Sequence, residues 1–128
     1  MIGFEDFHPV DGTPIYLQIL SYIKRGAVAG TITDGDELPS RRVLSALLGI
    51  NPNTVQKAFR MLEEEGLIES RTGAKSFMTL NEEKLRTMRA ELLHEDIRGI
   101  TEALRRMGIS KEEALDLIGT YWEETDGI

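Results

Sequence analysis

Apolar side chains recur at helical spacing along this chain of 128 residues and predict most of its elements. Residues 1–12 show no sustained period, so we expect an irregular arm there. The first helix is predicted by three isoleucines at four-residue intervals, Ile15, Ile19 and Ile23. Thr13 is its expected N-cap, Pro14 suits its first position, and Gly30 is expected to end it. A short strand or extended turn over residues 31–37 should lead to the next helix.

Two shorter helices follow, separated by a tight turn. The first begins after Ser40, and its predicted apolar side consists of Val43, Leu44, Leu47 and Leu48. Gly49 breaks it, Ile50 can turn into the core, and Asn51 caps a second helix that has Pro52 at its first position. Short helices joined by a turn that contains glycine are typical of a helix-turn-helix.

The helix after Asn51 has two faces of opposite character. Its core face is predicted by four apolar residues at i, i+3, i+4 and i+7, which are Val55, Ala58, Phe59 and Leu62. Gln56, Lys57 and Arg60 fall within roughly 60° of Asn53 on the other face. Amides pair bidentately with adenine, and Lys or Arg pairs with guanine or phosphate, so this face has chemistry suited to the major groove of DNA.

The start of the preceding helix predicts an anion site. Free main-chain N–H groups after Ser40, with Arg41 and Arg42 beside them, would hold a phosphate. The alternative is a simple cap with two solvated arginines. Between Glu37 and Glu63 the sequence contains no Asp or Glu, which favours the phosphate site.

A β-hairpin is predicted after the second short helix. Residues 67–69 and 76–79 should form its strands, with a turn over residues 70–73. In DNA-binding proteins such a hairpin is called a wing. Its polar residues could reach the DNA backbone or minor groove: Arg71, Thr72, Gly73 and Lys75. An ordinary two-stranded finish to the core, with a polar tip, is the alternative.

The last 50 or so residues predict two amphipathic helices. A long one begins at Asn81 and closes at Gly108, and Ser110 with Glu113 forms a capping box for the next. Two such helices cannot enclose an ordinary ligand cavity, so a second copy of the chain is the expected partner. The predicted dimerisation residues are Leu85, Met88, Leu92, Leu93, Ile97, Ile100, Leu104, Met107, Leu115, Ile118, Tyr121 and Trp122. A tail folded onto its own chain in a monomer is the alternative.

A net charge of −7 argues against nucleic-acid binding, but the distribution of the charges along the chain changes that interpretation. Residues 1–78 carry a net of −2 and residues 79–128 a net of −5, so most of the acidity lies outside the predicted DNA face. There is no Cys, and the two His are isolated, so no catalytic, metal or cofactor site is expected. No apolar run could span a bilayer, and we expect a soluble cytoplasmic protein with no membrane partner.

Four ordered blocks carry a family resemblance: PIYLQI (14–19), LPSRRVL (38–44), LGINPNTVQKAF (48–59) and LEEEGLIESRTG (62–73). They resemble the winged-helix domain of the GntR family of bacterial transcription regulators. The resemblance implies that these positions face DNA: Arg42, Asn51, Asn53, Thr54, Gln56, Thr72 and Gly73. The usual Gly-x-Gly of the wing is here Gly73, Ala74, Lys75, and the usual Pro-Gly before LPS is Asp34, Gly35. The short helical tail resembles the YtrA subfamily, whose members commonly repress transporter operons.

The expected fold is therefore mainly α with a small β-hairpin. Residues 1–79 are predicted to form a winged helix-turn-helix that binds double-stranded DNA, and residues 80–128 a helical dimerisation domain. The favoured function is a dimeric repressor that binds a pseudo-palindromic operator. The alternative is a winged-helix module that uses the same face to hold another protein. The sequence indicates no particular small-molecule effector.

Overall fold

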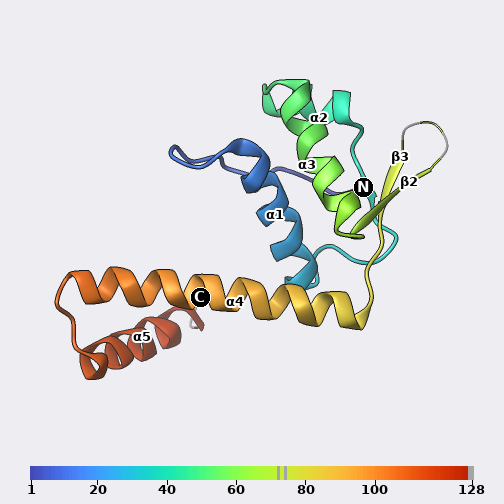
Figure 1. The fold of residues 1–128 in the computed structure, drawn as a ribbon. Coiled ribbons are helices and arrows are strands. Elements are labelled where there is room, and N and C mark those ends of the chain that lie inside the picture. The colour runs from blue at the N-terminus through green and yellow to red at the C-terminus, as the bar shows by residue number, and fades with distance from the viewer. Residues whose placement is uncertain (72, 74, 127–128) are drawn as a thin grey trace. The chain divides into compact units, whose positions relative to one another are not determined.

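The computed structural model describes residues 1–71, 73 and 75–126. It divides into two compact units, Met1–Ala90 and Glu91–Ile128. The first contains α1 (Ile15–Ala29), β1 (Glu37–Leu38), α2 (Arg41–Leu48), α3 (Pro52–Glu64), β2 (Ile68–Arg71) and β3 (Lys75–Met78) (Figure 1). The helix α4 (Glu82–Arg106) begins in the first unit and ends in the second, which also contains α5 (Lys111–Asp126). The predicted fold class, mainly helical with a small sheet, is confirmed.

The short helices begin and end where the sequence predicts. Ser40 Oγ accepts a hydrogen bond of 3.2 Å from the main-chain N–H of Val43, and Asn51 Oδ1 accepts one of 2.8 Å from that of Asn53. Gly49 ends α2 in the left-handed conformation at φ 66°. These caps satisfy main-chain groups that a helix end would otherwise leave without partners.

The start of α1 differs from the prediction. Pro14, not Thr13, is the residue before the first helical position, and no side chain caps this end. Instead Gln18, one turn into the helix, reaches back: its Nε2 donates to the carbonyl oxygens of Val10 and Thr13 at 2.9 and 2.8 Å, and its Oε1 accepts from Val10 N at 2.9 Å. The helix therefore holds the arm through an amide side chain.

The predicted hairpin is present, and a third strand joins it. The sheet has the order β1-β3-β2, with both neighbouring pairs antiparallel. Phe77 of β3 lies opposite Glu69 of β2 and opposite Glu37 of β1. A short strand or extended turn was expected before α2, and β1 is a short strand, but its pairing with β3 was not predicted from local pattern.

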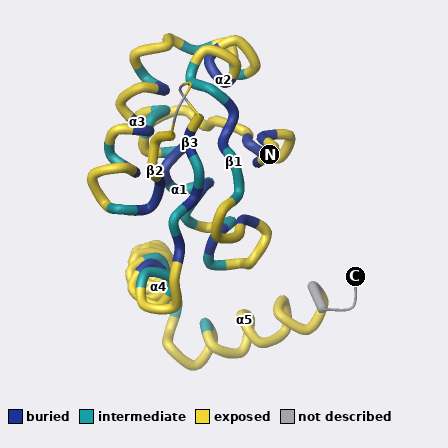
Figure 2. The backbone as a smooth tube through the Cα atoms, turned by 90° about the vertical axis from the view of Figure 1, so that its right-hand side faces the viewer, coloured by how far each residue is buried: buried dark blue, intermediate teal, exposed yellow. Residues whose placement is uncertain are grey.

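The core of the first unit lies between α1, α2, α3 and the sheet, where Figure 2 shows the buried segments. Its most completely buried side chains are Phe59, Ile19, Ile23, Leu38, Leu44, Leu62 and Val55. The predicted apolar side of α2 is only partly correct. Leu44 is buried and Leu48 is half-buried, but Val43 and Leu47 are 51% and 65% exposed because they lie on the outer side of this short helix.

The N-terminal arm is irregular, as predicted, but it is part of the core. Ile2, Phe4 and Phe7 are all buried. The ring of Phe4 stacks on that of Tyr22 of α1, with centroids 4.9 Å apart, and the Tyr22 hydroxyl donates to the carbonyl of Gly3 at 2.8 Å. Burial, followed by the nearby carboxylates of the arm, raises the pKa of Tyr22 above its usual value of 10.0.

The first turns of α4 also belong to the core of the first unit. Met88 is buried there and Leu85 packs against it, so these two residues, predicted to lie at a dimer interface, are covered within the chain instead. Lys84 Nζ donates to the carbonyl oxygens of Gly66 at 2.6 Å and Thr79 at 3.1 Å. The first compact unit consequently extends through Ala90.

In the second unit, the end of α4 and the whole of α5 form a helical hairpin. Gly108 turns the chain at φ 76°, and Ser110 Oγ accepts from the N–H of Glu113 at 3.2 Å. Figure 2 shows α5 exposed along nearly its whole length. Between the two helices lies an open groove of about 1020 Å³ whose lining is mostly apolar. No described helix is both long and apolar enough to cross a membrane.

Candidate nucleic-acid interface

The turn between α2 and α3 is locked by one buried side chain. Ser45 of α2 is 7% exposed, and its Oγ donates to the carbonyl of Ile50 at 2.6 Å. The N–H of Ile50 returns a hydrogen bond of 3.1 Å to the carbonyl of Ser45. This reciprocal pair fixes the path of the chain between the helices, and with it the angle at which α3 leaves the turn. The role of Ser45 was not predicted from the sequence, because a serine within an apolar stripe has no distinctive pattern.

The outer face of α3 is polar and free of acidic residues near its start. Asn53, Gln56 and Arg60 are exposed, while the four predicted core residues on the opposite face are buried. The arrangement matches the angular separation expected for a straight helix. The acids Glu63, Glu64 and Glu65 come only at the far end, where Lys24 Nζ of α1 meets Glu65 Oε1 at 2.8 Å.

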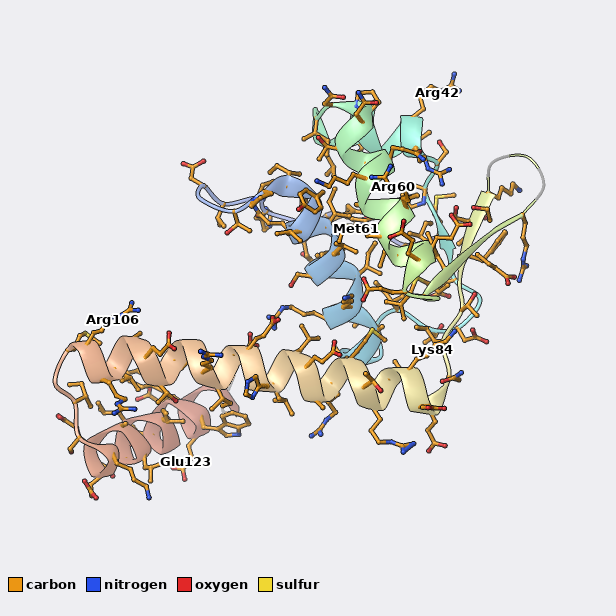
Figure 3. The ribbon with its side chains drawn as sticks, viewed as in Figure 1. Arg42, Arg60, Met61, Lys84, Arg106 and Glu123 are labelled. Carbon is orange, nitrogen blue, oxygen red and sulfur yellow. The ribbon has the colours of Figure 1, made fainter. Side chains whose placement is uncertain are left out.

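Arg42 lies at the exposed start of α2. No hydrogen bond or ion pair holds its guanidinium among the residues that the structure describes, and the same is true of Arg60 on α3. Figure 3 labels both arginines on this end of the first unit. The first N–H groups of α2 have no partners within the helix, so the arginine and the helix start together can accept an anion.

Two of the predicted DNA-facing cations turn toward the protein instead. Arg41 is half-buried, and its guanidinium carbon lies 5.3 Å from the ring centroid of Phe59. Lys57 Nζ lies 4.0 Å from the ring centroid of Tyr16 on α1. Each contact is a cation–π interaction. The sequence does not show these contacts, because a long side chain can bend toward an aromatic ring that a helical wheel leaves out.

The two cations predicted on the wing, Arg71 and Lys75, differ in their contacts. Arg71 forms an ion pair with Glu69, from Nη2 to Oε1 at 2.7 Å, and its guanidinium carbon lies 4.3 Å from the ring centroid of Phe77. Lys75 and Gly73 are exposed, and Gly73 has the left-handed φ of 80°. The predicted contact of Thr72 lies outside the described residues.

The remaining predicted residues gather around the turn before α3. Asn51 and Pro52 are exposed there, and Thr54 is half-buried one residue after Asn53. The Oδ1 atom of Asn51 caps α3, which leaves its amide nitrogen as the group able to reach a ligand. Ser40 is half-buried, and its hydroxyl caps α2. The arrangement therefore offers amide donors and acceptors at the start of α3.

Elsewhere the described residues form an exposed apolar surface but no metal-ligating cluster. No group of three or more His, Asp or Glu among them could hold a metal ion. In the second unit, apolar side chains are exposed among many charged ones, with Ile97, Tyr121 and Trp122 each 60% or more exposed. The polar face of α3 and the start of α2 are therefore the candidate binding surface.

Comparisons with known proteins agree with this geometry. Residues 15–77 match the family model described as bacterial regulatory proteins of the gntR family. The uncharacterized HTH-type transcriptional regulator YhcF of Bacillus subtilis (strain 168) is 34% identical over 110 residues, which cover 86% of this chain and 91% of that protein. The HTH-type transcriptional repressor YtrA of the same organism is 42% identical over 73 residues, covering 57% of this chain and 56% of that protein.

A solved structure extends the likeness to the fold. The GntR family transcriptional regulator from Listeria monocytogenes superposes with a TM-score of 0.75 at 29% identity, covering 88% of this chain and 98% of that one. The names of these relatives describe them as transcriptional regulators. The chain belongs to the GntR family of bacterial transcription regulators and carries its DNA-binding helix-turn-helix in α2 and α3.

Proposed function

We propose that this regulator is a dimeric repressor that reads a pseudo-palindromic operator with α3 of each copy. The observation that carries the proposal is the exposed face of Asn53, Gln56 and Arg60, which no acidic residue interrupts and which lies beside Arg42. The name of the relative YtrA, a transcriptional repressor, supports repression over activation. That the regulated operon encodes a transporter stays a prediction from the subfamily resemblance.

The side chains divide into two roles. Asn53 and Gln56 are the proposed base-reading residues, because amides pair with adenine in the major groove. Thr54 and the amide nitrogen of Asn51 contribute at the start of α3. Arg42 and Arg60 are the proposed phosphate contacts, because exposed guanidinium groups form charge-assisted pairs with backbone phosphates. Lys57 has a smaller role than the sequence predicted, since its ammonium group lies over Tyr16.

Dimerisation is assigned to the second unit. Eight of the predicted interface residues there are substantially exposed: Leu93, Ile97, Ile100, Met107, Leu115, Ile118, Tyr121 and Trp122. Leu92 and Leu104 are half-buried. An apolar surface of this extent on both helices is unfavourable in water, and a second copy would cover it. A twofold dimer would then present two α3 helices to half-sites about 34 Å apart, one turn of DNA.

The DNA-binding test uses the duplex upstream of the protein's own gene. Binding should weaken steeply as salt increases, because phosphate contacts release counterions. Arg42→Ala should lower affinity by about tenfold, since it removes one charge-assisted contact. Arg89→Ala is the matched control, because it removes an equal charge from an exposed position on α4. If no salt-sensitive complex forms, the proposed repressor function is wrong, and the alternative that this face binds another protein takes its place.

The dimer test keeps the full chain. A cut after residue 79 would remove Leu80 and Met88 from the core of the first unit, so it would confuse unfolding with loss of dimerisation. Ile100→Glu and Ile118→Glu instead place charges in the groove between α4 and α5. Equilibrium sedimentation should give twice the chain mass for the parent and the chain mass for each variant. A parent protein that sediments with the mass of one chain would contradict the proposed dimer.

A further inference from the structure

The outer face of the wing carries an ordered set of charges around one aromatic ring. Glu37 and Glu69 lie directly opposite Phe77, one on each side of it, and Arg71 lies opposite Lys75 next to the loop. Directly opposite residues of antiparallel strands share a face, and so do residues two apart on one strand. These five residues therefore lie together, with carboxylates beside Phe77 and cations near the loop; we call them the wing ladder.

Within the wing ladder, Arg71 is folded back from the loop. Its Nε donates to Glu69 Oε1 at 2.9 Å, and its Nη2 lies 2.7 Å from the same oxygen. Its guanidinium carbon stands 4.3 Å from the ring centroid of Phe77. Both partners lie farther from the loop than Arg71 does. The cation is therefore drawn toward the base of the hairpin, away from the end that a winged helix extends toward DNA.

The strength of this ion pair depends on how far its two side chains are exposed to water. The side chains of Arg71 and Glu69 are 56% and 51% exposed, so water and salt screen their attraction. Exposed pairs of this kind favour the paired state by only about one and a half to fivefold. A DNA phosphate is a competitive partner for a guanidinium, because it accepts two charge-assisted bonds and belongs to a dense line of negative charges.

We propose that Glu69 limits the affinity for operator DNA by competing with DNA phosphate for Arg71. On an unrelated duplex, α3 is not seated and the wing contact is weak, so Arg71 stays with Glu69. On the operator, the base contacts of α3 hold the wing against the backbone, and Arg71 exchanges its carboxylate for a phosphate. Glu69 thus lowers affinity for the operator, where the ion pair has to open, more than affinity for unrelated DNA. This inference rests on the proposed operator binding.

The chain offers a matched control for this role. Glu69→Gln and Glu37→Gln make the same change in charge, on the same face, on opposite sides of Phe77. Only Glu69 is paired with Arg71. Binding of the full-length parent and both variants is measured by fluorescence anisotropy over a salt series. The probes are the duplex upstream of the gene and a scrambled duplex of equal length.

Glu69→Gln should tighten binding to the upstream duplex by about one and a half to fivefold, because the ion pair no longer has to open for Arg71 to reach a phosphate. Binding to the scrambled duplex should tighten less, so the ratio of the two affinities rises. Glu37→Gln should leave that ratio unchanged. Adding Arg71→Ala to Glu69→Gln should remove the gain, because the released cation is then absent.

Equal effects of Glu69→Gln and Glu37→Gln would overturn the inference, because they would indicate a general charge effect. A Glu69→Gln variant that weakens binding and lowers Tm by more than roughly 3 °C would also overturn it, since the pair would then be structural. A parent that binds neither duplex gives a different result, the failure of the proposed operator binding itself. The comparison of parent and variants therefore separates the two proposals.

Discussion

Removing the Ser45 hydroxyl tests the link between local packing and the placement of α3. In Ser45→Ala, the hydrogen bond of 2.6 Å to the carbonyl of Ile50 is lost, in a site where Ser45 is 7% exposed. A net hydrogen bond contributes about 1 kcal/mol, and the orphaned carbonyl adds a cost of about 1 kcal/mol because Ile50 is only half-buried. The higher helix propensity of alanine offsets about 0.5 kcal/mol of this.

The expected net loss is therefore about 1.5 kcal/mol in the free energy of unfolding. For a unit of this size, that corresponds to a decrease in Tm of roughly 6 to 12 °C. Urea and thermal unfolding followed by circular dichroism measure both quantities. Ser21→Ala in α1 is the control, because it makes the same substitution in a helix where the hydroxyl only accepts a bond from the exposed Arg25 at 2.9 Å. If both variants are equally stable, the turn is not locked as described.

Three further predictions concern other parts of the first unit. Lys84→Met should lower the free energy of unfolding in urea by about 1 to 3 kcal/mol, because the ammonium group donates to two main-chain carbonyls. A loss below about 0.3 kcal/mol would show that water replaces these hydrogen bonds. Met88→Ala should lower the free energy of unfolding by about 2 to 4 kcal/mol in the same measurement, because it leaves a cavity in the core. The mass from sedimentation should not change. A variant that sediments as a monomer while the parent is a dimer would show that Met88 lies at the dimer interface. The raised pKa of Tyr22 stabilises the fold below pH 10.0, and this stabilisation should be lost as pH rises through the folded pKa. Tyr22→Phe should therefore show a flatter decrease in Tm at alkaline pH, and an unchanged slope would contradict the assigned cause.

The elements that the sequence predicted well are those whose signals are local. The caps Ser40 and Asn51, the glycine after α2 and the core face of α3 all follow from spacing within a few residues, and each is found in the structure. The polar face of α3 followed from the same helical angles. Such features need no knowledge of which distant segments meet.

The features that the sequence did not predict depend on contacts between distant segments. Phe4 has no periodic neighbours, yet it stacks on Tyr22 across the fold. Lys57 was assigned to DNA by its angle on α3, but Tyr16 of α1 attracts its ammonium group. Met88 fits the stripe of a dimerisation helix, but the first turns of α4 continue the core instead. In each case the deciding partner is remote in sequence.

The central claim is that two copies of α3 read two half-sites, and hydroxyl-radical footprinting of the upstream duplex tests it most directly. The parent protein should protect two patches related by a dyad and centred about one helical turn apart. Gln56→Ala should weaken both patches together, because each copy loses the same amide. A single asymmetric patch would contradict the dimeric reader, and uniform cleavage along the duplex at low salt would contradict operator binding by this face.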